Sequence, residues 1–128
     1  MEGVISFIND LDNKPQQKIM WALHNMFVSY PQISGKVKFN IPFYYHTTWV
    51  CYLKPIKPDA VEVCFMRGFD IQLYPKILLS KNRSMVKGIT VTKLTPKLMR
   101  QVETVFIEAI EVAKKTPFSV AHYKQHKM

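Results

Sequence analysis

Apolar side chains recur every three or four residues near both ends of the chain, a pattern typical of amphipathic helices. The pattern predicts a short helix over residues 4–11 and a second helix that ends near Ser29. Asp12 or Asn13 can cap the second helix. Pro15 falls in its first turn, where a missing N–H costs no hydrogen bond. Two helices are therefore expected before the middle of the chain.

A third and longer helix is expected from Pro96 to about Lys115. Thr95 precedes it as a helix-capping residue, and proline fits the first helical position. The apolar stripe of this segment continues without interruption to its basic end, which suits the negative end of the helix dipole. We expect one domain over residues 1–115, followed by a basic C-terminal tail over residues 116–128.

The middle of the chain alternates between apolar and other residues, which is the period of a half-buried β-strand. Strands are expected over residues 36–41, 43–46, 49–54, 60–66 and 85–91. Short connections join most of these segments, so that neighbouring strands must be antiparallel.

In the first expected strand, Val37, Phe39 and Ile41 alternate with polar residues. Phe39 is therefore expected in the core. Pro42 cannot donate a ladder hydrogen bond, which predicts an edge position or a bulge there.

The predicted fold class is α+β. It has two N-terminal helices, a central antiparallel sheet of about five strands, and a long C-terminal helix packed on one face. The other face of the sheet remains available to solvent or to a ligand.

The composition of the chain also indicates where in the cell the protein is expected. The chain has 128 residues, of which 48% are hydrophobic and 21% charged, a balance typical of one globular domain. No apolar run approaches the length of a membrane span, and the first residues lack the basic start of a secretory signal. Two cysteines without motif spacing favour a reducing compartment. We therefore expect a cytoplasmic protein with no membrane partner.

The net charge of +9 is unevenly distributed. Residues 1–35 hold two basic and three acidic residues, for a net charge of −1, whereas residues 36–128 hold sixteen basic and six acidic residues, for a net charge of +10. Between Asp70 and Glu103 there is no acid at all. A field of one sign attracts anions, although a basic isoelectric point is also an ordinary property of cytosolic proteins.

Several landmarks follow one another in a recognisable order. A basic strand enters an Ile-Pro-Phe-Tyr turn at residues 41–44, the hairpin over residues 49–57 follows, a later strand ends at Gly68, and the closing helix begins at Pro96. Over residues 4–115 this order resembles the bacterial YdhG-like family, a domain of unknown function. The resemblance implies the fold rather than a chemistry.

Some relatives in that family carry a frataxin-like, iron-chaperone label, which makes iron handling an alternative. Hard iron sites need clustered carboxylates. The first two helices offer only Glu2, Asp10 and Asp12, and a protein of net charge +9 repels cations. We therefore expect no metal site and no cofactor.

A catalytic constellation is not evident in the sequence. Reactive cysteines need a neighbouring cation and access, whereas strand cysteines such as Cys51 and Cys64 are typical of buried positions. A pair of Cys51 and His46 remains an alternative. His122 and His126 have the spacing of two metal ligands on a helix, but no third ligand is near them. We expect a binding protein rather than an enzyme.

Cations and aromatic rings gather around the predicted hairpin. Together they predict a non-catalytic module, monomeric or homodimeric, that binds an anionic small molecule or a protein partner. Single-stranded nucleic acid is an alternative partner, because basic surfaces with stacking rings bind it. The expected ligand-binding residues are Lys38, Tyr44, Tyr45, Trp49, Tyr52, Lys54, Arg67 and Lys87.

Overall fold

The structure is a computed structural model that describes residues 1–115, and the expected tail over residues 116–128 lies outside the described residues. The described elements, in chain order, are α1 (Glu2–Asn9), α2 (Lys14–Val28), β1 (Ser34–Lys38), β2 (Ile41–Tyr45), β3 (Trp49–Ile56), β4 (Ala60–Phe65), the 3-10 helix η1 (Gly68–Asp70), β5 (Lys87–Val91) and α3 (Pro96–Lys115).

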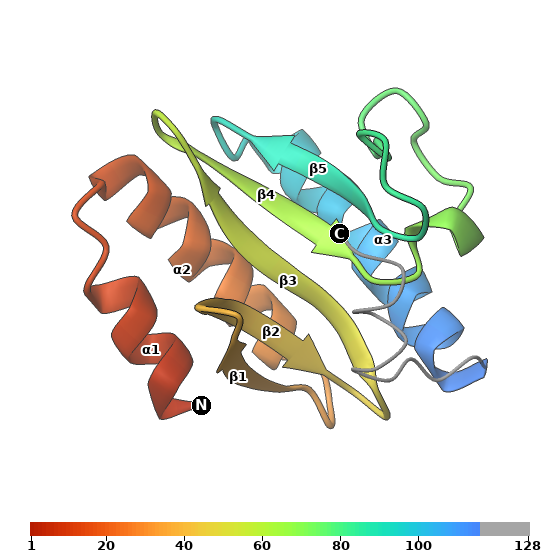
Figure 1. The fold of residues 1–128 in the computed structure, drawn as a ribbon, viewed down its shortest axis with the longest axis horizontal. Helices are drawn as coiled ribbons and strands as arrows, with labels where there is room; N and C mark the ends of the chain where they lie inside the picture. Colours follow the sequence, from red (N-terminus) through yellow and green to blue (C-terminus); the bar gives the residue numbers. More distant parts are fainter. Residues whose placement is uncertain (116–128) are drawn as a thin grey trace.

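The five strands form one antiparallel sheet in which neighbours in sequence are neighbours in space, in the order β1-β2-β3-β4-β5. Helices α2 and α3 cross behind this sheet, and α1 lies beside β1 (Figure 1). The predicted α+β fold class is therefore confirmed, including the long C-terminal helix on one face.

Both predicted helix caps are present. The Asn13 side chain accepts a hydrogen bond from the backbone N–H of Gln16 at 2.9 Å at the start of α2. The Thr95 hydroxyl accepts one from the backbone N–H of Leu98 at 3.2 Å before α3. Each cap satisfies one of the backbone donors that a helix start leaves without a partner.

The apolar residues form a cluster on each side of the sheet. The larger cluster lies between the sheet and the helices and includes Phe27, Phe65 and Phe106. We call the side of the sheet that faces away from α2 and α3 the outer face. The smaller cluster, the outer cluster, consists of Phe43, Trp49, Tyr52, Cys64, Met66 and Val86.

Strand β4 separates the two clusters, as its alternation predicts. Val61, Val63 and Phe65 face the helices, whereas Cys64 and Met66 belong to the outer cluster. All six residues of the strand are buried. A strand in the middle of a sheet that is covered on both faces has this burial pattern.

The expected strand over residues 36–41 is wrong, because a tight turn divides it. Lys38 pairs with Ile41, and the two residues between them, Phe39 and Asn40, have positive φ angles of 51° and 64°. Two positive φ values are typical of a type I′ hairpin turn. Phe39 is therefore not in the core, as the alternation suggested, but is 44% exposed at the hairpin tip.

Pro42 lies in β2, an interior strand of the sheet. It pairs with Val37 of β1, whereas the pairing between β2 and β3 begins at Phe43. The missing N–H therefore falls where β2 has a partner strand on one side only. The irregularity in this hairpin comes later, between Tyr44 and Tyr45, where the register with β3 shifts.

Among the described residues, no helix is both long and apolar enough to span a membrane.

Candidate functional site

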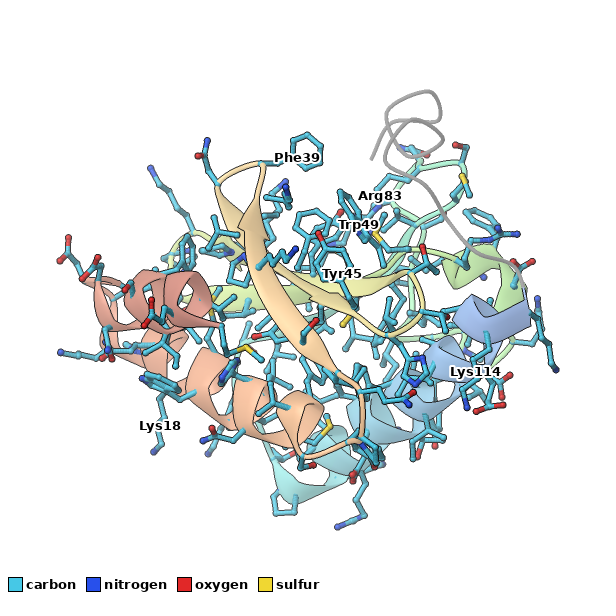
Figure 2. The ribbon with its side chains drawn as sticks, turned by 90° about the horizontal axis from the view of Figure 1, so that it is seen from below. Lys18, Phe39, Tyr45, Trp49, Arg83 and Lys114 are labelled. Carbon is cyan, nitrogen blue, oxygen red and sulfur yellow. The ribbon has the colours of Figure 1, made fainter. Side chains whose placement is uncertain are left out.

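The eight expected ligand-binding residues do not converge on one surface. Tyr45, Trp49 and Tyr52 lie on the outer face; alternation places Tyr45 and Tyr52 there, and Trp49 joins them because the register with β2 shifts between Tyr44 and Tyr45. Lys38 and Lys54 share this side by strand register. Figure 2 shows Tyr45 and Trp49 on the side of the sheet away from the helices, together with Phe39 and Arg83. Three of the eight lie elsewhere.

Tyr44 is the first exception. It points to the helix side, where its hydroxyl lies 2.8 Å from Nδ1 of His24 and its ring contacts Phe27 edge to face. The side chain is fully buried, and burial raises its pKa far above the usual range. The expectation that Tyr44 contributes to a ligand surface is therefore wrong, because adjacent strand residues point to opposite faces.

Arg67 and Lys87 are the other two exceptions. The guanidinium of Arg67 forms an ion pair with Asp70 at 2.9 Å in η1. The ammonium of Lys87 lies 4.9 Å from the ring centre of Phe69. Lys87 pairs with Phe65, which faces the helices, so the register also separates Lys87 from the outer face. Their expected place beside the hairpin aromatics is wrong.

Trp49 and Tyr52 lie on the outer face, but they are only 6% and 1% exposed. The ring of Phe43 packs between them, with centroid distances of 4.7 Å to Trp49 and 4.8 Å to Tyr52. Rings packed in this way stabilise the hairpin. Trp49 and Tyr52 are too buried to contact a ligand directly, so any such contact must involve more exposed neighbouring residues.

Those neighbours lie on the outer face of β1, β2 and β3 and in the β1–β2 turn. Lys36, which the sequence reasoning did not select, is exposed and has its ammonium 5.8 Å from the ring centre of Tyr45. Lys38 is also exposed, and Lys54 lies two residues beyond Tyr52 on the same side of β3. We call Lys36, Lys38, Phe39, Tyr45 and Lys54 the hairpin surface.

No acid occurs between Asp12 and Asp59, a gap that contains the whole hairpin surface. The absence of acids around Lys36 is a feature of the sequence that could have identified it as a candidate anion-binding residue. Within residues 1–115, no carboxylate forms an ion pair with Lys36, Lys38 or Lys54. Lys54 lies opposite Glu62 in the register of β3 and β4, but that carboxylate binds Arg83 and Lys81, so all three cations can attract an anion that approaches.

A buried ion pair occupies the other half of the outer face. Glu62 is 3% exposed, and its carboxylate lies 2.8 Å from Arg83 and 3.4 Å from Lys81. Burial alone raises the pKa of Glu62, but the hydrogen bond and charge of Arg83, with the charge of Lys81, lower it overall. Arg83 also donates to the carbonyls of Ser80 and Leu79, so this carboxylate anchors the segment that leads to β5.

The two cysteines have environments that disfavour nucleophilic chemistry. Burial, then the charge of Glu62, raise the pKa of Cys64 to about 12, although Arg83 lies 3.6 Å from its sulfur. Burial raises the pKa of Cys51 well above its ordinary value. Thiols that remain protonated at neutral pH are weak nucleophiles. The two residues lie on opposite faces of the sheet and both are free.

His46 lies in the β2–β3 turn, and it lines a depression of about 360 Å³ with Tyr30, Ile107 and Glu111. Its Nδ1 is buried and has no hydrogen-bond partner among the described residues. The suggested partner Cys51 is fully buried in the core on the helix side. Tyr30, which also lines this depression, does not bind His46: its hydroxyl donates to Glu103 at 2.5 Å, and this hydrogen bond raises the pKa of Tyr30 to about 12.

Within residues 1–115, no group of three His, Cys, Asp or Glu side chains is placed to hold a metal ion. The described residues therefore supply no ligand set for iron. The expected pair of His122 and His126 lies outside them.

Comparison with known proteins identifies the fold. No family model matches the chain, and no curated protein matches it. Among solved structures, the crystal structure of YdhG from Bacillus subtilis, a protein of the DUF1801 family, is similar with a TM-score of 0.62 at 12% sequence identity. The match covers 93% of this chain and 96% of that protein. The chain thus has a YdhG-like fold, as its sequence landmarks suggested.

Proposed function

We propose that this YdhG-like domain is a non-catalytic binding module, and that its hairpin surface binds an acidic segment of a protein partner. One observation carries the proposal: Lys36 and Lys38 of β1 and Lys54 of β3 lie on the outer face of the sheet, within an acid-free stretch of the chain. Exposed cations that form no ion pair with a carboxylate favour an anionic partner and speed its association.

The exposed ring of Phe39 adds contact area to this charge. Phe39 adopts a positive φ angle, which is unfavourable for a residue of its size, and it remains 44% exposed. Aromatic side chains are enriched at protein interfaces, where they supply area at a small entropic cost. A partner with both acidic and apolar residues fits this combination.

Single-stranded nucleic acid is favoured less by the same geometry. A stacking platform needs accessible rings in succession. Tyr44, Trp49 and Tyr52 are buried, so the described hairpin offers Phe39 and the half-buried Tyr45. Nucleic acid therefore enters the test as a competitor of the acidic peptide.

The test measures fluorescence anisotropy of a fluorescein-labelled oligoglutamate peptide titrated with the protein at low salt. The triple variant Lys36→Gln, Lys38→Gln, Lys54→Gln should bind about tenfold more weakly, because each exposed ion pair contributes up to about 1 kcal/mol. The matched control is Lys76→Gln, Lys97→Gln, Lys115→Gln, which has the same net charge and changes exposed lysines elsewhere.

The control should retain most of the affinity. Equal losses in the two triple variants would show that only the net charge matters and would overturn the assignment to the hairpin surface. Labelled oligothymidylate with the same number of charges forms the second arm. Tighter binding of oligothymidylate than of oligoglutamate would favour the nucleic-acid alternative.

A further inference from the structure

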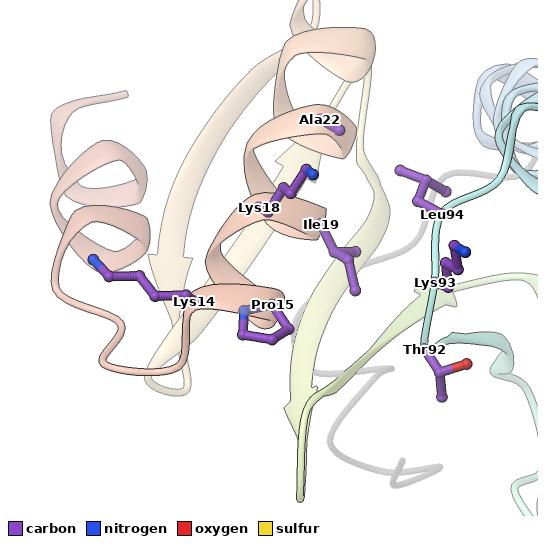
Figure 3. A pocket seen from close by; sticks show the side chains of 8 residues that line it. All are labelled: Lys14, Pro15, Lys18, Ile19, Ala22, Thr92, Lys93 and Leu94. Atoms are coloured by element: carbon purple, nitrogen blue, oxygen red, sulfur yellow. The ribbon is translucent and has the colours of Figure 1, made fainter.

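The helix side of the molecule contains a cleft that the hairpin surface does not involve. It has a volume of about 490 Å³ and lies between the first half of α2 and the segment that joins β5 to α3. Figure 3 shows Ile19 on one wall and Leu94 on the other, with both side chains directed into the gap. The lining residues are Lys14, Pro15, Lys18, Ile19, Ala22, Thr92, Lys93 and Leu94.

The lining combines an apolar floor with cations. Pro15, Ile19 and Ala22 follow one another at intervals of four and three residues, so they share one face of α2. Lys18 rises from the α2 wall and Lys93 from the opposite wall, whereas the side chain of Lys14 points away (Figure 3). The ammonium of Lys14 lies instead 3.4 Å from the side-chain oxygen of Gln17.

The two walls come from the two acid-free stretches of the chain. One stretch lies between Asp12 and Asp59 and the other between Asp70 and Glu103, and no acid is among the lining residues. Within the described part of the chain, neither Lys18 nor Lys93 is in an ion pair. The fold therefore places positive charge around apolar surface that is exposed at Pro15, partly exposed at Ala22 and Leu94, and buried at Ile19, which is 6% exposed.

Both walls are attached to the same sheet. The buried side-chain amide of Gln16 donates at 3.0 Å to the carbonyls of Ile56 and Ala60, which holds the start of α2 against the β3–β4 turn. The opposite wall continues β5, and the Thr95 cap then fixes the start of α3. The cleft is consequently preformed, so that little ordering is needed when a ligand binds.

We propose that this cleft binds an amphipathic anion, a molecule with one carboxylate, sulfonate or phosphate group on a short apolar body. The apolar body covers Ile19 and Leu94, and the anionic group lies between the ammonium groups of Lys18 and Lys93. The site is separate from the hairpin surface: Lys18 lies on the helix side, opposite to Phe39 and Tyr45 (Figure 2).

The test uses 8-anilinonaphthalene-1-sulfonate, whose fluorescence rises in apolar surroundings, and its uncharged analogue N-phenyl-1-naphthylamine. The folded wild-type protein should bind the sulfonate at a single site. The double variant Lys18→Gln, Lys93→Gln should weaken sulfonate binding about tenfold, from two exposed charge pairs, and leave binding of the uncharged analogue within about twofold. The control Lys76→Gln, Lys115→Gln should bind the sulfonate as the wild type does.

A second variant tests the apolar floor. Ala22→Phe fills the cleft and should abolish binding of both probes while the thermal unfolding transition is retained. If Ala22→Phe does not fold, the lysine variants decide alone. Unchanged sulfonate affinity in Lys18→Gln, Lys93→Gln, or absence of sulfonate binding to the wild type, overturns the proposal.

The triple hairpin variant separates the two proposals. Lys36→Gln, Lys38→Gln, Lys54→Gln should bind the sulfonate normally. Loss of sulfonate binding in that variant would place the probe on the hairpin surface and would also overturn the cleft assignment. The outcome of the oligoglutamate titration does not enter this result.

Discussion

A single glycine allows the buried ion pair of the outer face to form. A Cβ atom at Gly88 would lie 2.1 Å from Oε2 of Glu62 and 2.7 Å from its carboxyl carbon. Arg83 and Lys81 hold that carboxylate in place, so it cannot move away without losing its partners. The residue in β5 must therefore be glycine as long as Glu62 is bound to Arg83.

We predict that Gly88→Ala lowers the free energy of unfolding by about 1–3 kcal/mol, the range for overpacked interiors, in urea denaturation. In the Glu62→Ala background, Gly88→Ala should lower the free energy of unfolding by less, because the atoms that clash are absent. The effects of the two changes should therefore be strongly non-additive. As a control, Gly3→Ala in α1 should be neutral or stabilising, because the nearest atom to the added Cβ would be Cγ2 of Val37 in β1, at 3.6 Å. Additive effects of Gly88→Ala and Glu62→Ala would contradict this account.

At the scale of elements, the sequence allowed the helices and β4 to be predicted because each carries its own signal. Asn13 and Thr95 cap their helices with side chains that the sequence displays directly. In β4 the residues from Val61 to Phe65 alternate between the helix side and the outer face. These signals are local, so no knowledge of the remaining fold was needed.

The β1–β2 hairpin was missed for a physical reason. A two-residue turn pairs Lys38 with Ile41, so that an even-numbered position faces the same side as an odd-numbered one. Val37, Phe39 and Ile41 keep an interval of two residues across the turn, but Val37 and Ile41 lie on opposite faces of the sheet. The turn was difficult to recognise from the sequence because Phe39 and Asn40 form it, whereas most turns of this type contain glycine.

His24 joins α2 to β2 through the Tyr44 hydroxyl and is 4% exposed. Burial, and secondarily the charge of the N-terminus, lower its pKa below the ordinary value of 6.5. The unfolded chain therefore takes up this proton first as the pH falls. The contribution of neutral His24 to stability is complete above about pH 6.5 and decreases as the pH falls toward the lowered pKa of the folded state.

We predict that the wild type loses stability between about pH 7.5 and pH 5 relative to His24→Gln, which has no titrating group at this position. Urea denaturation of both proteins across this range measures the difference, and the remaining histidines cancel because both proteins contain them. A constant difference in the free energy of unfolding over the range would refute the assignment of a neutral His24.

At the scale of the whole molecule, the charge pattern could be read from the sequence but its location could not. Lys18 and Lys93 are far apart in the chain, and only the packing of α2 against the sheet brings them to the same cleft. The sequence contains the acid-free stretches that contribute the two walls. Which stretches meet depends on long-range packing, for which no local pattern exists.

The excess of positive charge predicts how salt affects the folded state. With a net charge of +9, repulsion among exposed cations opposes the compact state. The distance over which charges interact falls from about 30 Å at 0.01 M salt to about 8 Å at 0.15 M. The free energy of unfolding, measured by urea denaturation, should therefore rise as sodium chloride increases over this range.

The buried pair of Glu62 and Arg83 is screened little by salt, so it should not reverse this trend. Binding of oligoglutamate to the hairpin surface should weaken over the same range, because the attraction between exposed charges is screened. Stability and binding are thus expected to change in opposite directions with salt. A fall in stability would mean that attractive surface pairs outweigh repulsion among the exposed cations, and it would contradict this prediction.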